Sequence, residues 1–326
     1  MIILTGGAGF VGTNLLDGLN EAGETDILVV DDIGVSSKWS NLVGRRFRDY
    51  VPRDGLWDWI EQERHLSVDA VLHFGACSDT RETDFDYLLE NNVRYSQRLW
   101  NYCTKWQASF IYASSAATYG SGEYGFSDDH AGVSILKPLN RYGFSKQLFD
   151  LWTLGQSSSP PFWAGLKLFN VYGPHEEHKG GQASMVYHAT RQVMETEKVQ
   201  LFRSLRQDVA DGEQRRDFVY VQDVVKVVLR MIEGAAPSGL YNIGTGKACT
   251  FNQLAEAVFD ALEQPRRIEY IDMPKELAVQ YQDFTEARMD KLESAGIPVP
   301  ATQVPKGVQD YMGYLVPSAS LSKAAR

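Results

Sequence analysis

A tyrosine and a lysine four residues apart form the pair whose chemistry is easiest to state. In the segment Tyr142-Gly-Phe-Ser-Lys146 both side chains share one face of a helix, because residues i and i+4 are neighbours there. A free phenol titrates near about pH 10, and a neighbouring cation favours the phenolate and lowers that pKa. The pair therefore indicates a base, Tyr142, that exchanges a proton with a hydroxyl group while Lys146 tunes it.

A serine lies upstream of this pair, just after a short apolar segment. Residues 109–112 have the pattern of a buried strand, and Ser115 follows them. A hydroxyl in that place can hydrogen-bond the same substrate group that Tyr142 serves. A Tyr-x-x-x-Lys match often arises by chance, so the hypothesis depends on its combination with Ser115 and with a glycine cluster at the start of the chain.

That glycine cluster, residues 5–12, separates an apolar strand pattern from a helical one. In such a turn Gly6 and Gly9 let the backbone approach a pyrophosphate, Gly12 lets the helix pack on the strand, and the helix N-terminus favours negative charge. Asp31 ends the next apolar run, at the spacing typical of a carboxylate that binds a ribose. The sequence predicts a bound nicotinamide dinucleotide.

The form of the dinucleotide is less clearly indicated. Asp31 can accept hydrogen bonds from a free ribose hydroxyl and would repel a 2'-phosphate, so it favours NAD, and Asp32 adds to that preference. Lys38 and Arg53 lie nearby in sequence and could supply cations to a phosphate. The residues by themselves favour NAD and leave NADP open.

The elements that must position these residues alternate between strand and helix. Helical spacing appears at residues 14–21, 87–105 and 142–154, and short buried runs at residues 1–5, 26–30, 70–74, 109–112 and 163–169. This alternation predicts an α/β fold, a Rossmann-like doubly wound parallel sheet.

The pattern changes after Asn170. Loops rich in glycine, histidine and charge are followed by helices at 184–197 and 251–262, whereas 216–231 repeats the strand-then-helix pattern. We predict a dinucleotide-binding domain of residues 1–169, to which 216–247 return, and a smaller α/β substrate-binding domain of residues 170–215 and 248–315. Residues 316–326 are predicted to be a tail without chemistry.

The composition excludes several classes of function. A net charge of -10 over 326 residues leaves no broad basic surface for nucleic acid or an anionic membrane. No window reaches the length of a membrane span and no leader is evident, so we expect a soluble, cytoplasmic protein. His175 and His178 have no convincing third ligand, so no metal is expected. Three widely spaced cysteines suggest neither a disulfide framework nor a metal site: Cys77, Cys103 and Cys249.

Together with the segments 74–78 and 168–174 and with Asn91, these motifs resemble the extended short-chain dehydrogenase/reductase family, whose members act on nucleotide sugars. Sugar 4,6-dehydratases of that family place an Asp-Glu pair after the serine or threonine. This chain has Ala116-Ala117 instead. Epimerisation or simple dehydrogenation is therefore expected rather than elimination of water.

Within that family, residues 75–78, 114–120, 178–180, 216–221 and 281–285 are similar to the ADP-glyceromanno-heptose 6-epimerases. The resemblance runs from the first residue to about Tyr314. It implies an isomerase of carbohydrate metabolism that makes a lipopolysaccharide core precursor, oxidising and re-reducing C6 of an ADP-linked heptose with bound NADP. It also implies a homo-oligomer, and Lys179 as a second acid/base group opposite Tyr142.

The resemblance implies a full set of site residues. The catalytic residues would be Tyr142, Lys179, Lys146 and Ser115. Tyr142, Lys146 and Lys179 would also contact the cofactor, with Gly6, Gly9, Phe10, Val11, Gly12, Asp31, Asp32, Lys38, Arg53, Phe74, Gly75, Ala76, Cys77, Ser78, Asn91 and Val171. The ADP-sugar would contact Ser115, Asn170, Gly181, His188, Phe202, Arg203, Ser204, Arg216 and Tyr281.

Some positions depart from the family pattern. Asp32 replaces an expected Asn, Arg53 a Lys and Gly181 a Ser, and the loop 205–214 is longer than usual. The resemblance moves the expected cofactor to NADP. Two alternatives remain: a UDP-sugar 4-epimerase, which needs one tyrosine base and no Lys179, and a non-enzymatic dinucleotide sensor, which should lack Tyr142 or Lys146.

Overall fold

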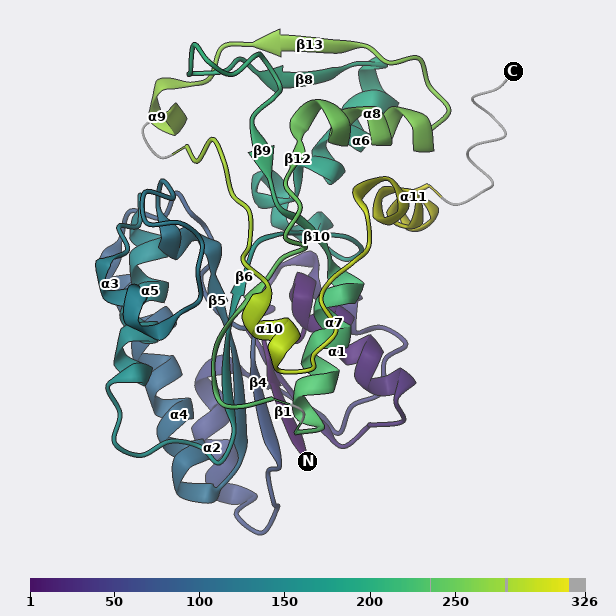
Figure 1. The fold of residues 1–326 in the computed structure, drawn as a ribbon. Helices are drawn as coiled ribbons and strands as arrows, with labels where there is room; N and C mark the ends of the chain where they lie inside the picture. The colour runs from purple at the N-terminus through teal and green to yellow at the C-terminus, as the bar shows by residue number, and fades with distance from the viewer. Residues whose placement is uncertain (235, 279–280, 317–326) are drawn as a thin grey trace.

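The computed structural model describes residues 1–234, 236–278 and 281–316. Its largest element is a sheet of seven parallel strands in the order β11-β6-β5-β4-β1-β2-β3 (Figure 1). The strands are β1 (Ile2–Thr5), β2 (Ile27–Asp31), β3 (Asp49–Pro52), β4 (Ala70–His73), β5 (Ser109–Ser115), β6 (Trp163–Leu168) and β11 (Gly239–Ile243). The strand order reverses between β1 and β4, where such sheets bind ligands. The predicted Rossmann-like doubly wound fold is confirmed.

The central strands read as unbroken apolar runs because both faces of the sheet are covered. Successive side chains of β1 point to opposite faces, so Ile2 and Leu4 enter one hydrophobic core and Ile3 enters the other. This arrangement fixes the carboxyl ends of the strands, where the predicted site residues lie.

Two helical layers cover the sheet (Figure 1). On one face α1 and α7 pack against each other over Leu15 and Val225, and on the other α2, α4 and α5 enclose Trp100, Phe110 and Phe149. The helices of this part are α1 (Phe10–Glu21), α2 (Leu56–Gln62), α3 (Phe85–Leu88), α4 (Tyr95–Trp106), α5 (Arg141–Leu154), α7 (Val221–Ile232) and α10 (Asp290–Ser294).

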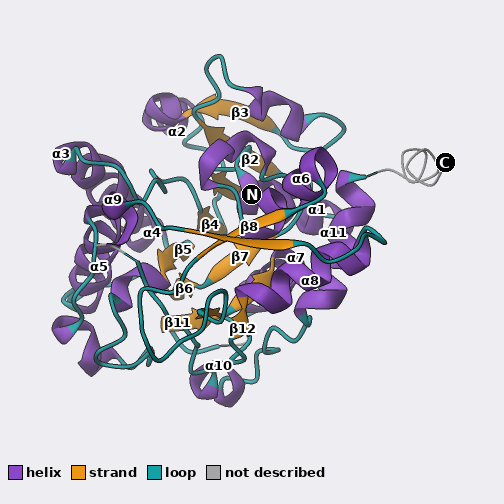
Figure 2. Cartoon of the chain, turned by 90° about the horizontal axis from the view of Figure 1, so that it is seen from above, coloured by secondary structure: helices purple, strands orange, loops and turns teal. Residues whose placement is uncertain are grey.

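A smaller domain lies over the carboxyl ends of the strands (Figure 2). It has its own core, around Val186, Leu254 and Tyr311. Two of its helices begin at a side-chain cap, Ser184 for α6 and Thr250 for α8. Its helices are α6 (Met185–Thr196), α8 (Phe251–Ala261), α9 (Lys275–Ala278) and α11 (Val304–Leu315). Its short strand pairs are β8 (Val199–Phe202) with β13 (Ile268–Ile271) and β9 (Arg215–Arg216) with β12 (Cys249–Thr250).

The connection between the two parts runs through a further parallel pair, β7 (Asn170–Tyr172) and β10 (Phe218–Tyr220). After β10 the chain returns to the large domain, where α7 packs on α1 and β11 pairs with β6. Leu292 and Ile297 also lie in the core beneath α1 and α7. We therefore propose the division given by the sequence, with residues 289–297 added to the large domain.

Most of the predicted elements are present with shifted ends. The helix expected over 87–105 comprises three consecutive pieces, α3, a π-helical turn at Leu89–Arg94 and α4. Several elements were not predicted: β3, α2, the pair β8–β13 and α10, which are short, and α11, which has twelve residues and a buried apolar face. Of the predicted tail 316–326, residues 317–326 lie outside the described residues. Within the described ranges, every helix is too short or too polar to cross a membrane.

Candidate active site

A cavity of about 700 Å³ opens over the carboxyl ends of β1, β4, β5 and β6, beneath the small domain. It adjoins a pocket of about 270 Å³ with which it shares Gly6, Asp31 and Lys38. A larger cavity, of about 790 Å³, lies beside α8 and the start of α11 and contains none of the predicted site residues. The predicted residues, not the size of the cavity, identify the candidate site.

The structure brings most of the predicted residues into this site. The cavity is lined by all four predicted catalytic residues, Ser115, Tyr142, Lys146 and Lys179, by Asn170, and by Gly6, Gly9, Phe10, Val11, Gly12, Asp31, Lys38, Phe74, Gly75, Ala76, Cys77, Ser78 and Val171. The adjoining pocket adds Asp32, Arg53 and Asn91.

The glycine turn between β1 and α1 has the geometry of a phosphate cradle. Gly6 has a φ of +70°, and a Cβ there would lie 2.5 Å from the amide nitrogen of Gly75. A Cβ at Gly12 would lie 2.0 Å from the Gly6 carbonyl oxygen. Gly9 provides no side-chain cap for α1, so backbone N–H groups of the first turn are available to an anion. The turn therefore fits the pyrophosphate of a dinucleotide.

The ribose end of the site contains two carboxylates and two cations. Asp31 accepts a hydrogen bond from the Ala8 amide at 2.9 Å and pairs with the Lys38 ammonium at 2.6 Å. Arg53 lies 3.4 Å from the Asp32 carboxylate and hydrogen-bonds Asn91. The Asp31 charge is thus balanced by Lys38, a pairing that the spacing of the two residues does not reveal.

The serine, tyrosine and lysine meet where β5 ends beside α5. Asn140 caps this helix by accepting a hydrogen bond from the Gly143 amide at 2.8 Å. The Lys146 Nζ donates to the Ala113 carbonyl at 2.9 Å and lies 5.9 Å from the centre of the Tyr142 ring. The expected helical pair is therefore present, in contact with the strand that carries Ser115.

The environment shifts the pKa of both groups. Burial lowers the pKa of Lys146 to about 8, against the opposing charge of Asp150. Burial raises the pKa of Tyr142, and a hydrogen bond with Ser115 acts in the opposite direction. A cationic nicotinamide ring in the same cavity would also favour the phenolate.

Lys179 also lines the cavity and lies on the 3-10 segment η6 (Glu177–Gln182). Its Nζ lies 5.2 Å from the centre of the Phe10 ring, and burial lowers its pKa while Glu176 opposes the shift. The fully buried Glu176 carboxylate accepts a hydrogen bond from the Ser184 hydroxyl at 2.7 Å. This contact holds both ends of the segment that carries Lys179.

A second contact ties the same segment to the glycine turn. Asn41 donates to the Ala8 carbonyl at 3.0 Å and lies 3.4 Å from the His178 Nδ1. The other histidine, His175, instead contacts Arg45 at 2.9 Å and Tyr314 at 3.0 Å. The two histidines thus have separate partners. The described residues contain no cluster of three metal-ligating side chains.

The remaining predicted substrate contacts lie outside the cavity lining: Gly181, His188, Phe202, Arg203, Ser204, Arg216 and Tyr281. Arg216 is buried, stacks on the Tyr281 ring at 5.0 Å, and forms none of the ion pairs found among the described residues. Arg203 is half exposed and pairs with Asp211 at 2.8 Å, within the longer loop. Their role in binding stays a prediction.

Several lining residues were not predicted. Tyr87 and Tyr95 flank Asn91 at intervals of four, so helical periodicity could have indicated that they line the same pocket. Phe218 and Phe251 come from distant parts of the chain and join the cavity through the packing of β10 and α8. No local pattern marks them.

Comparison with known proteins agrees with this geometry. The model of the NAD dependent epimerase/dehydratase family matches residues 2–244. The chain is 51% identical over 313 residues to the ADP-L-glycero-D-manno-heptose-6-epimerase of Nitratidesulfovibrio vulgaris (strain DP4), covering 96% of this chain and 97% of that one. It is 46% identical to the protein of that name from Fusobacterium nucleatum, again over 96% of this chain and 97% of the relative.

A solved structure shows the same likeness. The Helicobacter pylori ADP-L-glycero-D-manno-heptose-6-epimerase superposes with a TM-score of 0.81 at 29% identity, covering 96% of this chain and 95% of that one. The family match supports a nicotinamide dinucleotide as the cofactor, as the glycine turn indicates. On the extent of the family match and the identity of these relatives, the chain belongs to the NAD dependent epimerase/dehydratase family.

Proposed function

We propose that this protein epimerises C6 of an ADP-linked glycero-manno-heptose through transient oxidation and re-reduction with bound NADP. The observation that carries the proposal is that two ionisable groups, Tyr142 and Lys179, line one cavity together with the glycine turn. Inverting an alcohol carbon requires hydride to leave one face of the carbon and return to the other, while the oxygen loses a proton and then regains one in a second orientation. Two groups on separate elements can serve the two orientations of that oxygen. The names of the relatives support the ADP-heptose as the substrate.

The dinucleotide, when bound, supplies the chemistry of hydride removal and return. Tyr142 exchanges a proton with the C6 hydroxyl of one epimer, and Ser115 hydrogen-bonds the same oxygen. Lys179 exchanges a proton with the hydroxyl of the other epimer after the aldehyde has turned over. Because burial lowers the pKa of Lys179, its ammonium releases a proton more readily than an exposed lysine would.

Lys146 has a supporting role in this scheme. Its ammonium lies close to the Tyr142 ring and is held by the Ala113 carbonyl, so it favours the phenolate without taking part in proton transfer to the sugar. It can also bind the cofactor ribose. Of the proposed catalytic residues, Tyr142 should therefore depend most on the charge of the Lys146 ammonium.

Arg216 is the strongest candidate for holding the substrate pyrophosphate. Among the described residues the buried Arg216 guanidinium has no carboxylate within ion-pair distance, and a buried charge of this kind costs free energy unless an anion joins it. Its planar fork suits phosphate oxygens. The other predicted contacts of the ADP-sugar would surround it in the small domain. Their assignment is part of the proposal, as are a homo-oligomer and a cytoplasmic location.

The charges at the ribose end support NADP rather than NAD as the cofactor. Lys38 neutralises Asp31 and Arg53 lies beside Asp32, so the two carboxylates that would repel a 2'-phosphate are each accompanied by a cation. Arg53 is about a third exposed and can turn toward a phosphate. This pairing favours NADP more than the sequence spacing alone does.

The test is to incubate the purified protein with each C6 epimer of the ADP-heptose and to follow the sugar by NMR. We expect interconversion to one equilibrium mixture without added NADP, because the cofactor is regenerated in each cycle. Lys179→Met should slow interconversion about 100-fold while the NADP stays bound. Interconversion of a UDP-sugar at C4 that survives Lys179→Met would instead favour the single-base alternative.

A further inference from the structure

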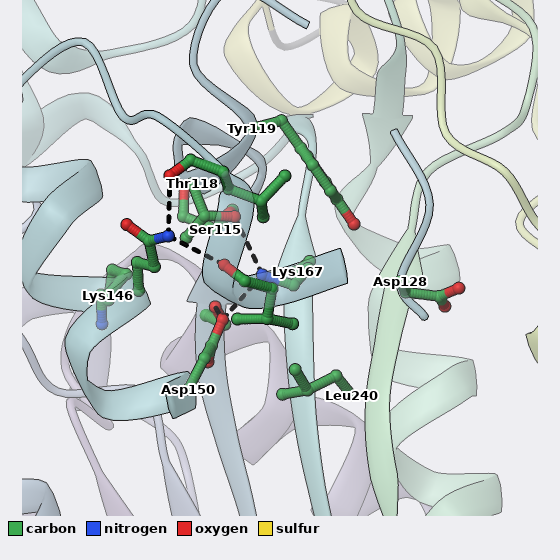
Figure 3. Close-up of polar contacts among 12 residues, drawn as sticks. Ser115, Thr118, Tyr119, Asp128, Lys146, Asp150, Lys167 and Leu240 are labelled. Carbon is green, nitrogen blue, oxygen red and sulfur yellow. Dashed lines mark hydrogen bonds and ion pairs between the residues drawn. The ribbon is translucent and has the colours of Figure 1, made fainter. Parts of the chain in front are cut away.

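A fully buried ion pair lies directly behind the proposed catalytic residues. The Lys167 ammonium on β6 lies 2.7 Å from the Asp150 carboxylate on α5, and neither side chain is exposed to solvent (Figure 3). Asp150 follows Lys146 by one helical turn, and Lys167 lies beside β5 in the sheet. The pair therefore joins the helix that carries Tyr142 and Lys146 to the two strands next to it.

Stability does not account for this pair. Removing two charges from water costs several kcal/mol per ion, and buried pairs can often be replaced by apolar side chains without loss of stability. The surroundings of the pair are mixed: Phe149 and Trp163 lie in the adjoining core, whereas the Tyr112 hydroxyl donates to Asp150 at 3.0 Å and the Lys167 ammonium lies 5.1 Å from the centre of the Tyr119 ring. The charges hold neighbouring hydroxyl groups in place, which a pair of apolar side chains of the same size could not do.

The hydrogen bonds of the pair lead to Ser115. The Asp150 carboxylate accepts a hydrogen bond from the Ser114 hydroxyl at 2.8 Å. The Lys167 ammonium donates to the Thr118 hydroxyl at 2.9 Å (Figure 3). This hydroxyl in turn donates to the Ser115 carbonyl at 2.8 Å.

The helix α5 is in this way attached to three successive residues of β5. Lys146 holds the carbonyl of Ala113, Asp150 holds the hydroxyl of Ser114, and Asp150 acts through Lys167 and Thr118 on the carbonyl of Ser115. These contacts set both the position and the orientation of the Ser115 residue relative to the first turns of α5.

We propose that Lys167 is a positioning residue for the reaction: held between Asp150 and Thr118, it fixes the end of β5 so that the Ser115 hydroxyl stays on the Tyr142 phenol. The inference rests on the function proposed above, because that function gives Ser115 and Tyr142 their shared contact with the sugar hydroxyl. Lys167 itself touches neither substrate nor cofactor. Its effect passes through Thr118.

Two buried threonines make a matched test, because both belong to this network and only one reaches Ser115. Thr118 bridges Lys167 and Ser115, whereas the Thr153 hydroxyl donates to the Asp150 carbonyl at 2.8 Å and lies 3.4 Å from the Tyr112 hydroxyl. Each is changed to valine, which keeps the shape and removes the hydroxyl. We expect Thr118→Val to lower kcat about tenfold with an unchanged KM, and Thr153→Val to stay within about twofold of the wild type.

A third variant, Lys167→Met with Asp150→Asn, removes both charges and leaves neither of them unpaired. We expect its Tm to stay near that of the wild type while kcat falls on the order of 100-fold, because a misplaced reacting group costs rate and not stability. A wild-type kcat in this variant, or equal losses in the two threonine variants, would show that the pair only joins secondary-structure elements.

A readout that needs no sugar separates this inference from the proposed function. The ¹³Cζ NMR signal of Tyr142 in the NADP-loaded protein, assigned with Tyr142→Phe, reports the hydrogen bond to its hydroxyl. The signal should move in Thr118→Val and stay in place in Thr153→Val. If the wild type leaves the ADP-heptose unchanged, the proposed function fails, and this signal still decides whether Lys167 positions the pair. An unmoved signal in Thr118→Val overturns the inference.

Discussion

The two proposed acid/base groups sit on very different supports. Tyr142 lies on the long helix α5, which buried hydrogen bonds attach to successive residues of β5. Lys179 lies on the short segment η6, next to Gly180 with a φ of +52°, and depends on Glu176 and His178 for its position. The sheet thus positions Tyr142, whereas a loop between the two domains positions Lys179. Substitutions at the two supports should therefore behave differently.

The largest loss of kcat should come from changing Tyr142, the group on the rigid support. Tyr142→Phe removes the hydroxyl and leaves the network beneath it intact, so we expect kcat to fall about 10³-fold with NADP still bound. Steady-state kinetics with the ADP-heptose measure the loss. Tyr124→Phe, an exposed tyrosine outside the cavity, is the control. A Tyr142→Phe variant within tenfold of the wild type would remove this residue from the mechanism.

The next effect concerns the cations that accompany Asp31 and Asp32. Lys38→Ala should weaken NADP binding relative to NAD about 10- to 100-fold, because a charge-assisted hydrogen bond to phosphate contributes about 1.5–3 kcal/mol. Calorimetric titration of the cofactor-free protein with both dinucleotides gives the ratio.

Arg48→Ala is the matched control for that ratio, since Arg48 precedes β3 and pairs with Asp26 outside the pocket. It should leave the ratio of the two affinities unchanged. An unaltered ratio in Lys38→Ala as well would mean that Lys38 serves only to neutralise Asp31.

A smaller effect should follow from loosening the support of Lys179. Glu176→Gln removes a buried charge that raises the pKa of Lys179, so this pKa should fall further and the segment should lose part of its anchor. We expect kcat to fall about tenfold while NADP affinity is retained. Glu177→Gln, at the neighbouring position, should change kcat by less than about twofold. Kinetics and cofactor titration on both variants distinguish these outcomes.

The most gradual effect is a dependence on pH. The pKa of Lys146 is lowered to about 8, so its ammonium is present below that pH and is lost as the pH rises through it. If the ammonium supports NADP binding, affinity should be constant below about pH 8 and fall by at most about tenfold per pH unit above it. Lys146→Arg stays charged throughout, and its affinity should not show this alkaline decline. Titrations between about pH 6 and about pH 10 provide the check.

How far the sequence predicts the site depends on how local the signal is. The pair Tyr142 and Lys146 follows from spacing on one helix, and the glycine turn and Asp31 follow from one strand-helix-strand unit. Lys179 has no such spacing, and only its resemblance to a family pattern indicated it. The structure then placed it in the same cavity as Tyr142.

Contacts between distant segments were beyond the sequence patterns. Lys167 interrupts the buried run of β6, and Asp150 faces inward from α5, but nothing local shows that the two charges meet. The strands β8 and β13 pair across about 70 residues, and each is only four residues long, too short for periodicity to identify. Both the ion pair and the β8–β13 pairing form only when distant parts of the chain pack together, so no local pattern predicts them.

The proposed mechanism requires direct return of the hydride to the carbon that it left. The decisive measurement is therefore the fate of deuterium placed at C6 of the ADP-heptose during epimerisation in ordinary water. We predict that the product epimer keeps its deuterium at C6, as mass spectrometry and NMR would show, because bound NADP carries it from one face to the other. Deuterium that exchanges into the solvent would contradict the account, since inversion would then proceed by removing a proton from carbon.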